Sequence, residues 1–323
     1  MLISILLLVV GLVLILGGAN YLTEGSAAVA KRMGMSDFIV GLTIVSMMTS
    51  APELVVSVMS AFKASTEMAV GNIVGSNIFN ILAIMGVVAM IKPIGVTRGV
   101  LVNEIPLMIL SSVVLLVMGL SPLLDSGPMV VTRVDGLLLL LFFVVFMRYT
   151  IASAKHMPQP DEPVAADGAR QKELPLWRAL VYLVGGLAAL IFGGQLFVDG
   201  AVGVARILGW SEALIGLTIL AAGTSLPELA TSAVAAMRGF PGLCLGNVIG
   251  SCIFNVFFVL GLTSVIKPLA FGQIGVFDLS TLVGASLLFW FVGWFYKKRT
   301  ITRSEGLLMF ACYVAYTVYK ILA

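Results

Sequence analysis

The chain has 323 residues, of which 60% are hydrophobic and only 11% charged, and its formal net charge is +3. A water-soluble fold of this length could not hide so much apolar surface, because part of every fold must face water. The composition therefore excludes a soluble globular domain and indicates that the surrounding solvent is largely lipid.

Ten stretches of the chain are apolar and long enough to cross a membrane, which takes roughly 20 residues. Each is continuously apolar rather than alternating, which favours helices over barrel strands. The first stretch lacks the basic start and the cleavage motif of a signal peptide, so it is interpreted as a span. In chain order they cover residues 3–21, 38–62, 69–91, 100–120, 134–151, 179–198, 213–237, 243–266, 277–296 and 306–321.

The most hydrophilic stretch follows the fifth apolar segment and contains the only histidine, His156. It predicts a short linker, residues 155–175, between a first five-helix half at 1–154 and a second at 176–323. If the N-terminus is outside, most of the 19 Lys and Arg residues lie on the linker side, which the positive-inside rule makes cytoplasmic. We expect a multi-pass inner-membrane protein with both termini outside.

The two halves repeat each other in sequence at a shift of 175 residues. Residues 49–54 (TSAPEL) fall on 224–229 (TSLPEL), and residues 71–80 (GNIVGSNIFN) fall on 246–255 (GNVIGSCIFN). Because each half has an odd number of spans, the second half begins on the opposite side of the membrane. The predicted fold is an all-α membrane protein of ten transmembrane helices in two inverted repeats, an arrangement that recurs in secondary transporters.

Glu53 and Glu228 are the carboxylates that stand near the middle of predicted spans. An ionised carboxylate costs several kcal/mol at that depth, so each indicates a functional site. No basic residue lies mid-span to pair with them, and a bound cation is the simplest counter-charge. Glu104, near the start of the fourth apolar segment, is instead expected at the membrane interface.

Oxygen-bearing side chains recur at four-residue spacing around both glutamates, and residues four apart share one helix face. The sets are Thr49, Glu53 and Ser57; Thr224, Glu228 and Ser232; Asn72, Ser76 and Asn80; and Asn247, Ser251 and Asn255. Oxygen ligands of this kind suit Ca²⁺, Na⁺ or K⁺ and argue against Zn²⁺ or copper. Pro52 and Pro227 lack an N–H, so each leaves carbonyls of the preceding turn free to bind an ion.

These two motif pairs, at 41–80 and 216–255, resemble the alpha repeats of the sodium/calcium exchanger (cation/calcium antiporter) superfamily, in its compact prokaryotic form. The resemblance extends over essentially the whole chain. It implies a central cluster of cation sites in which Glu53 and Glu228 are shared ligands. The other ligands that it implies are Thr49, Ser50, Thr224, Ser225, Ser76, Asn80, Ser251 and Asn255, with backbone oxygens of Ser46 and Ala221 at outer sodium sites.

The expected function is antiport of Ca²⁺ against Na⁺ by alternating access. The alternative is a proton-coupled antiporter with the same site, or a K⁺-dependent one; potassium-dependent relatives carry Asp where this chain has Asn80 or Asn255, which disfavours the latter. A channel would need a continuous pore and usually a symmetric oligomer, and an intramembrane protease would need a Ser/His or Asp pair. We expect no enzyme activity, no cofactor, no nucleic-acid partner and no obligate protein partner. The partners are the transported ions and the lipid bilayer.

Overall fold

The computed structural model of the chain is built mainly of helices and describes all residues except 64–65, 122–126, 155–173, 210–220, 296–298 and 323. The predicted linker therefore lies almost wholly outside the described residues. The α-helices are α1 Leu2–Met33, α2 Asp37–Val40, α3 Ser46–Thr49, α4 Ala51–Phe62, α5 Thr66–Ile78, α6 Met85–Ile91, α7 Ile105–Gly119, α9 Arg133–Ala154, α10 Leu176–Ile207, α12 Ala221–Gly223, α13 Leu226–Met237, α14 Pro241–Phe254, α15 Gly261–Ile266, α16 Val276–Phe295 and α17 Arg303–Leu322.

Four π-helical segments and four short strands complete the described elements. The π-helical segments are η1 Gly41–Val45, η2 Phe79–Ile84, η3 Val100–Glu104 and η5 Asn255–Leu260. The strands are β1 Ile94–Gly95, β2 Val130–Val131, β3 Leu269–Ala270 and β4 Thr300–Ile301.

Within the described residues, eight helices are long and apolar enough to cross a membrane, and α2–α3 joined with α4 gives a ninth. The predicted segment at 213–237 lies partly outside the described residues. Large apolar side chains such as Leu141, Val144 and Val145 on α9 are exposed, as expected for a surface that faces lipid. The chain is thus a multi-pass helical membrane protein, and the expectation of helices rather than barrel strands is confirmed.

The chain divides into two compact units, each made of segments from both sequence halves. Unit 1 comprises Met1–Thr49, Thr150–Val248 and Tyr316–Ala323, and unit 2 comprises Ser50–Tyr149 and Ile249–Ala315. The chain passes from unit 1 to unit 2 at Ser50, where a helix is broken.

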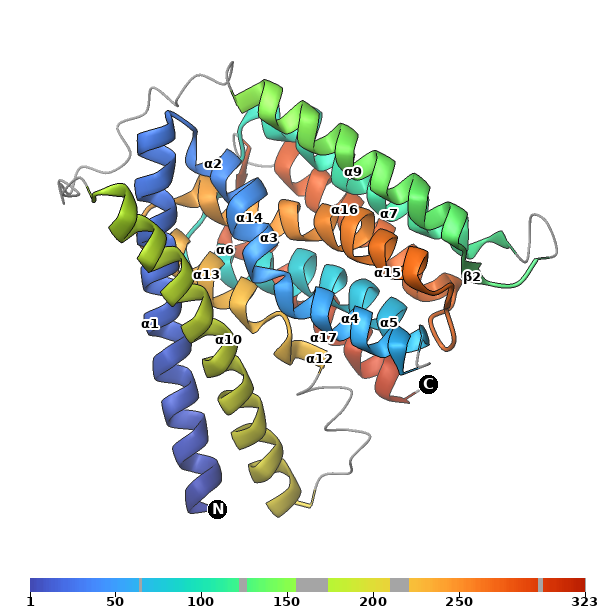
Figure 1. The fold of residues 1–323 in the computed structure, drawn as a ribbon, viewed down its shortest axis with the longest axis horizontal. Coiled ribbons are helices and arrows are strands. Elements are labelled where there is room, and N and C mark those ends of the chain that lie inside the picture. The colour runs from blue at the N-terminus through green and yellow to red at the C-terminus, as the bar shows by residue number, and fades with distance from the viewer. Residues whose placement is uncertain (64–65, 122–126, 155–173, 210–220, 296–298, 323) are drawn as a thin grey trace. The chain divides into compact units, whose positions relative to one another are not determined.

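In unit 1, α1 and α10 lie side by side along much of their length (Figure 1). Glycines make this close approach possible. A Cβ added at Gly18 would stand 2.7 Å from the carbonyl oxygen of Gly186, and one added at Gly193 would stand 2.9 Å from that of Gly11. Both helices have 32 residues, considerably more than the predicted spans at 3–21 and 179–198.

In unit 2, α7 packs against α16, and the hydroxyls of Ser112 and Ser286 are hydrogen-bonded across that contact at 3.1 Å. Two antiparallel ribbons tie loops of the two halves together. Strand β1 pairs with β4, and β2 pairs with β3. Unit 2 therefore holds its helix ends in register by backbone hydrogen bonds as well as by side-chain packing.

The two ribbons of unit 2 correspond to each other in the sequence repeat. The 175-residue shift carries Ile94 of β1 onto Leu269 of β3, and the strands that pair with them, β4 and β2, each precede a helix with the same cap. At that cap, the Thr132 N–H donates to Asp135, and the Thr302 N–H donates to Glu305, both at 2.8 Å. This is the capping-box arrangement at a helix N-terminus.

The repeat is also visible where helices end. Lys92 and Lys267 follow α6 and α15 in extended conformation, with φ −143° and −148°. Each stands directly before a proline, which disfavours the helical region for the preceding residue. The shared Ile-Lys-Pro sequence thus ends the same helix in both halves.

The structure adds one fact about Glu104, for which the sequence predicts a position at the membrane interface. Its side chain is fully buried in unit 2. The position near the start of an apolar segment predicts depth along the helix, whereas burial of the side chain depends on packing against neighbouring helices.

Candidate ion-binding site

The helix break before each motif glutamate is the first local feature of the site. Ser50 and Ser225 have nearly the same backbone conformation, φ −83° and −93° with ψ 8° in both, and Pro52 and Pro227 follow in the first turn of α4 and α13. Proline cannot donate a backbone hydrogen bond, so the helix cannot continue unbroken through this turn. The predicted opening of the chain before Glu53 and Glu228 is present in both copies.

In unit 2, Glu53 is fully buried on α4, and the Ser76 hydroxyl on α5 stands 3.5 Å from its Oε1 as a donor. The Asn72 amide donates to the backbone carbonyl of Glu53 at 3.3 Å and to the Ser57 hydroxyl at 3.1 Å. Asn72 therefore fixes α5 against the turn of α4 that carries the carboxylate.

In unit 1, Glu228 is fully buried on α13. The Asn247 amide on α14 donates to the Glu228 carbonyl at 3.5 Å and to the Ser232 hydroxyl at 3.0 Å. These are the contacts that Asn72 makes in unit 2, at the positions that the repeat predicts. Within each motif, the helix that carries the asparagine stripe thus contacts the helix that carries the glutamate stripe.

Thr49 departs from its prediction. It ends α3, before the break at Ser50, so it does not continue the helical stripe of Glu53 and Ser57 on α4. Its hydroxyl donates to the Asn247 Oδ1 in unit 1 at 3.0 Å. Thr224 likewise precedes its helix, in a turn between α12 and α13. The sequence spacing suggested one continuous face, which the helix break interrupts.

The two motif asparagines Asn80 and Asn255 lie in π-helical turns at corresponding positions, in η2 and η5. Such turns are frequent at functional sites. Both residues are fully buried in unit 2, as is Ser251. The side-chain oxygen and nitrogen of Asn80, the Oδ1 of Asn255 and the Oγ of Ser251 have no hydrogen-bond partner in the described residues.

Buried polar atoms are nearly always hydrogen-bonded to protein or to water, so such a group requires an explanation. Glu53, Ser76, Asn80, Ser251 and Asn255 all belong to unit 2, and α4, α5 and η5 pack against one another there. Carboxylate, amide and hydroxyl oxygens in this setting can coordinate a hard cation. Among the described residues, no three His, Cys, Asp or Glu side chains lie together so that they could hold a metal ion. Neutral oxygens would therefore make up most of any ligand set.

Asn77 is a site neighbour that sequence analysis did not single out. Its amide donates to the Cys252 carbonyl at 3.0 Å, and its Oδ1 accepts from the Asn255 amide at 3.0 Å. The repeat carried a signal for it, because residue 77 aligns with Cys252 and is one of the few differences within the second motif segment. Asn77 orients Asn255 and leaves the Oδ1 of that residue available.

The remaining predicted ligands are Ser46, Ala221, Ser50 and Ser225. Ser46 is fully buried, and its hydroxyl donates to the Leu42 carbonyl at 2.8 Å, while its own carbonyl accepts from the Thr49 hydroxyl at 3.4 Å. Ala221 begins α12. Ser50 and Ser225 are fully buried.

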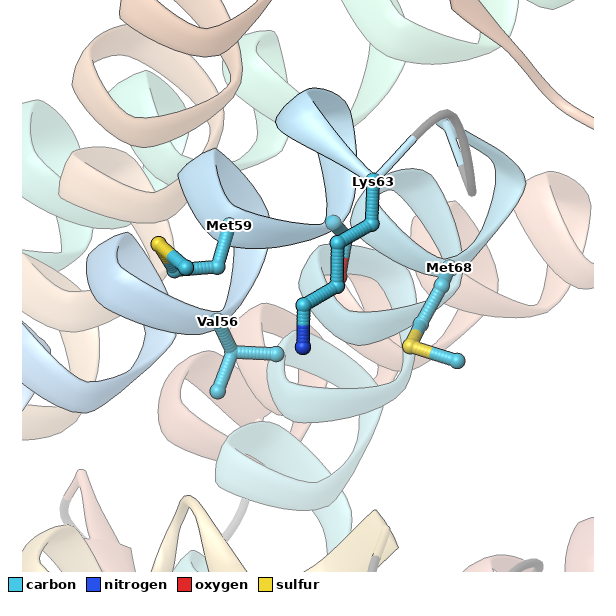
Figure 2. A pocket seen from close by; sticks show the side chains of 5 residues that line it. Val56, Met59, Lys63 and Met68 are labelled. Carbon is cyan, nitrogen blue, oxygen red and sulfur yellow. The ribbon is translucent and has the colours of Figure 1, made fainter.

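A surface hollow on unit 2 is separate from these residues. Figure 2 shows the Lys63 side chain extending between Val56 and Met68 in this hollow, which Met59 and Ser60 also line. None of its lining residues is a predicted ligand, and its only ionisable group is a cation. It is therefore not a cation site.

Comparison with known proteins identifies the family. The profile of the sodium/calcium exchanger protein family matches residues 3–152 and 178–322. The chain belongs to the sodium/calcium exchanger family. This is a family of transporters, and membership of it supports a role for the chain in antiport of cations against Ca²⁺ across a membrane.

Members of the family match over nearly the whole chain. The chain is 40% identical to a putative antiporter, CaxA, of Alkalimonas amylolytica, and 30% identical to the sodium/calcium exchanger MaX1 of Methanosarcina acetivorans, with 98% of both chains covered in each case. Structures of the sodium-calcium exchanger NCX_Mj superpose with a TM-score of 0.82 at 30% identity, covering 98% of this chain and 99% of that one. The resemblance of the motifs to this family is confirmed.

Proposed function

We propose that the protein exchanges Ca²⁺ for Na⁺ across the inner membrane by alternating access. The observation that carries this proposal is the fully buried glutamate in each motif, Glu53 and Glu228, together with buried amide and hydroxyl oxygens that lack hydrogen-bond partners in unit 2. A cation bound among these oxygens would balance the carboxylate charge and give the oxygens a partner.

Both carboxylates serve the same ions in this proposal. The support comes from the sequence repeat, which supplies one carboxylate per half, and from charge balance. One Ca²⁺ neutralises two carboxylates, as do two Na⁺. Because both ions need the same charges, they compete, and the empty site with two negative charges is costly to carry across a medium of low dielectric constant. Competition of this kind produces exchange rather than leak.

The full ligand set that we propose keeps the oxygens of both halves. It comprises Glu53, Glu228, Thr49, Thr224, Ser50, Ser225, Ser76, Ser251, Asn80 and Asn255, with the backbone carbonyls of Ser46 and Ala221 at outer sodium sites. This set has more oxygens than the about 6–8 that one Ca²⁺ takes, so it is divided among the overlapping sites of a cation cluster. The transported ions are substrates, and the proposal includes no resident cofactor.

The proposed architecture is ten transmembrane helices in two inverted five-helix repeats, with both termini outside and the linker in the cytoplasm. Its support is the correspondence of the two ribbons and their helix caps. Inverted halves can present equivalent gates to opposite sides of a membrane. The Lys/Arg distribution of the sequence supports the same orientation.

The coupling ion has a competing candidate. Two similar proteins, MaX1 and NCX_Mj, are named as sodium/calcium exchangers. This similarity supports Na⁺ as the coupling ion of the present chain. A proton-coupled antiporter would use the same two carboxylates, protonated in place of binding sodium. Asn80 and Asn255, which are both neutral, support neither a further acidic ligand nor dependence on K⁺.

The test is uptake of radioactive calcium into proteoliposomes loaded with sodium. We expect uptake that requires an outward sodium gradient and is lost in Glu53→Gln and in Glu228→Gln. Glu67→Gln, the same chemical change at an exposed residue on α5, is the matched control and should transport normally. Uptake driven by a pH gradient and indifferent to sodium would replace this proposal with the proton-coupled one.

A further inference from the structure

Unit 2 contains a third buried carboxylate that the proposed exchange does not use. Glu104 ends η3, and its side chain is fully buried. The Tyr149 hydroxyl on α9 donates to its Oε1 at 3.3 Å, whereas its Oε2 is buried without a hydrogen-bond partner in the described residues. A carboxylate with so little solvation must be neutralised by an ion or by a proton.

In the turn that carries Glu104, a side chain from another helix replaces a missing backbone hydrogen-bond donor. In this π-helical turn the Ile105 N–H donates to the Val100 carbonyl. In the same register, the N–H of residue 106 would donate to the Leu101 carbonyl. That residue is Pro106, which has no N–H. The Trp290 indole on α16 donates to the Leu101 carbonyl instead, at 2.8 Å. Glu104 therefore sits in a turn fixed from outside its own helix.

The ionisable groups around Glu104 supply no counter-charge in the described residues. Helix α7, which continues from η3, has no ionisable side chain. Helix α16 has Asp278 at its start, which accepts from the Gly275 N–H. Helix α9 has Arg133, Asp135, Arg148 and Tyr149, of which Arg133 donates to the Val265 carbonyl and Arg148 is exposed.

The surroundings also differ from those of Glu53. The side-chain hydrogen-bond partner of Glu104 is a phenol, and within the described part of the chain no group of three metal-ligating acids, histidines or cysteines includes it. A hard metal cation would need several more oxygens, whereas a proton needs only the carboxylate itself.

We propose that Glu104 and Tyr149 form a proton-binding site, in which Glu104 is a neutral carboxylic acid in the folded protein. This site goes beyond the proposed exchange, and its existence does not depend on which ions are transported. Because the proton is bound at a residue other than the two motif carboxylates, it would make transport sensitive to pH without being exchanged for calcium.

Infrared difference spectroscopy of the purified protein at neutral pH tests the site directly. We expect a carboxylic-acid carbonyl band that is lost in Glu104→Gln and retained in the exposed control Glu67→Gln. In Tyr149→Phe the band should persist and shift to higher wavenumber, because the carbonyl oxygen loses its donor. The proposal is overturned if Glu104→Gln removes a carboxylate band instead, or if no carboxylic-acid band changes.

A second readout separates this site from the transport proposal. If calcium uptake requires sodium, Glu104→Gln should flatten the dependence of uptake on pH and leave the sodium requirement unchanged. A pH profile identical to that of the wild type contradicts a role in regulation. Absence of sodium-dependent uptake in the wild type would count against the proposed exchange alone, since the infrared band is measured without any ion gradient.

Discussion

Asn72 and Asn247 show how a single side-chain type builds the same support twice. Each amide bonds to the backbone carbonyl of a motif glutamate and to the hydroxyl of the serine one turn later. These bonds hold the helix turn that carries each carboxylate. The sequence predicted these residues as members of polar stripes, but only the packing of the helices shows which partners they hold.

Removal of the Asn72 or the Asn247 amide should destabilise the protein. In Asn72→Ala and Asn247→Ala, we expect the free energy of unfolding to fall by about 1–3 kcal/mol, because buried partners lose their donor. The measurement is the thermal unfolding midpoint in detergent. Asn103→Ala, at an exposed position, is the control and should leave the midpoint nearly unchanged; equal midpoints for all variants would refute the role of the two amides.

At the scale of elements, the sequence predicted helices well and their interruptions only in part. The break before each glutamate followed from Pro52 and Pro227. The π-helical turns at Asn80 and Asn255 did not, because an extra residue in one turn leaves no mark in hydrophobic periodicity. The burial of Glu104 does not follow from the sequence either, since its partner Tyr149 and the indole of Trp290, which holds the same turn at Leu101, come from helices distant in the sequence.

The packing of α1 on α10 can be tested at two adjacent glycines, Gly17 and Gly18. A Cβ at Gly18 would meet backbone atoms of α10 at 2.7 and 2.8 Å, whereas a Cβ at Gly17 would have no atom within 4 Å. We expect Gly18→Ala to destabilise the protein by about 1–3 kcal/mol, as overpacking generally does, and Gly17→Ala to be tolerated.

Thermal unfolding and size-exclusion profiles of the two alanine variants provide the comparison. The pair Gly193 and Gly194 on α10 offers a repeat of the test, because only Gly193 contacts α1 closely. If both members of a pair behave alike, the close backbone contact does not contribute to stability.

At the scale of the whole molecule, the repeat at 175 residues accounts for most of what the sequence could foretell. It predicted the paired motifs, the paired helix ends and the position of each glutamate, because equivalent sequences form equivalent local structure. What it could not foretell lies where the copies differ. Asn77 stands opposite Cys252, so it has no counterpart to draw attention to it.

The central claim is that Glu53 and Glu228 serve one ion site at which calcium and sodium compete. Equilibrium calcium binding to the purified protein in lipid nanodiscs, measured with increasing sodium, tests it most directly. We expect calcium binding that sodium displaces and that both Glu53→Gln and Glu228→Gln abolish. Calcium binding that persists in either variant, or that sodium leaves unchanged, would contradict a single shared site.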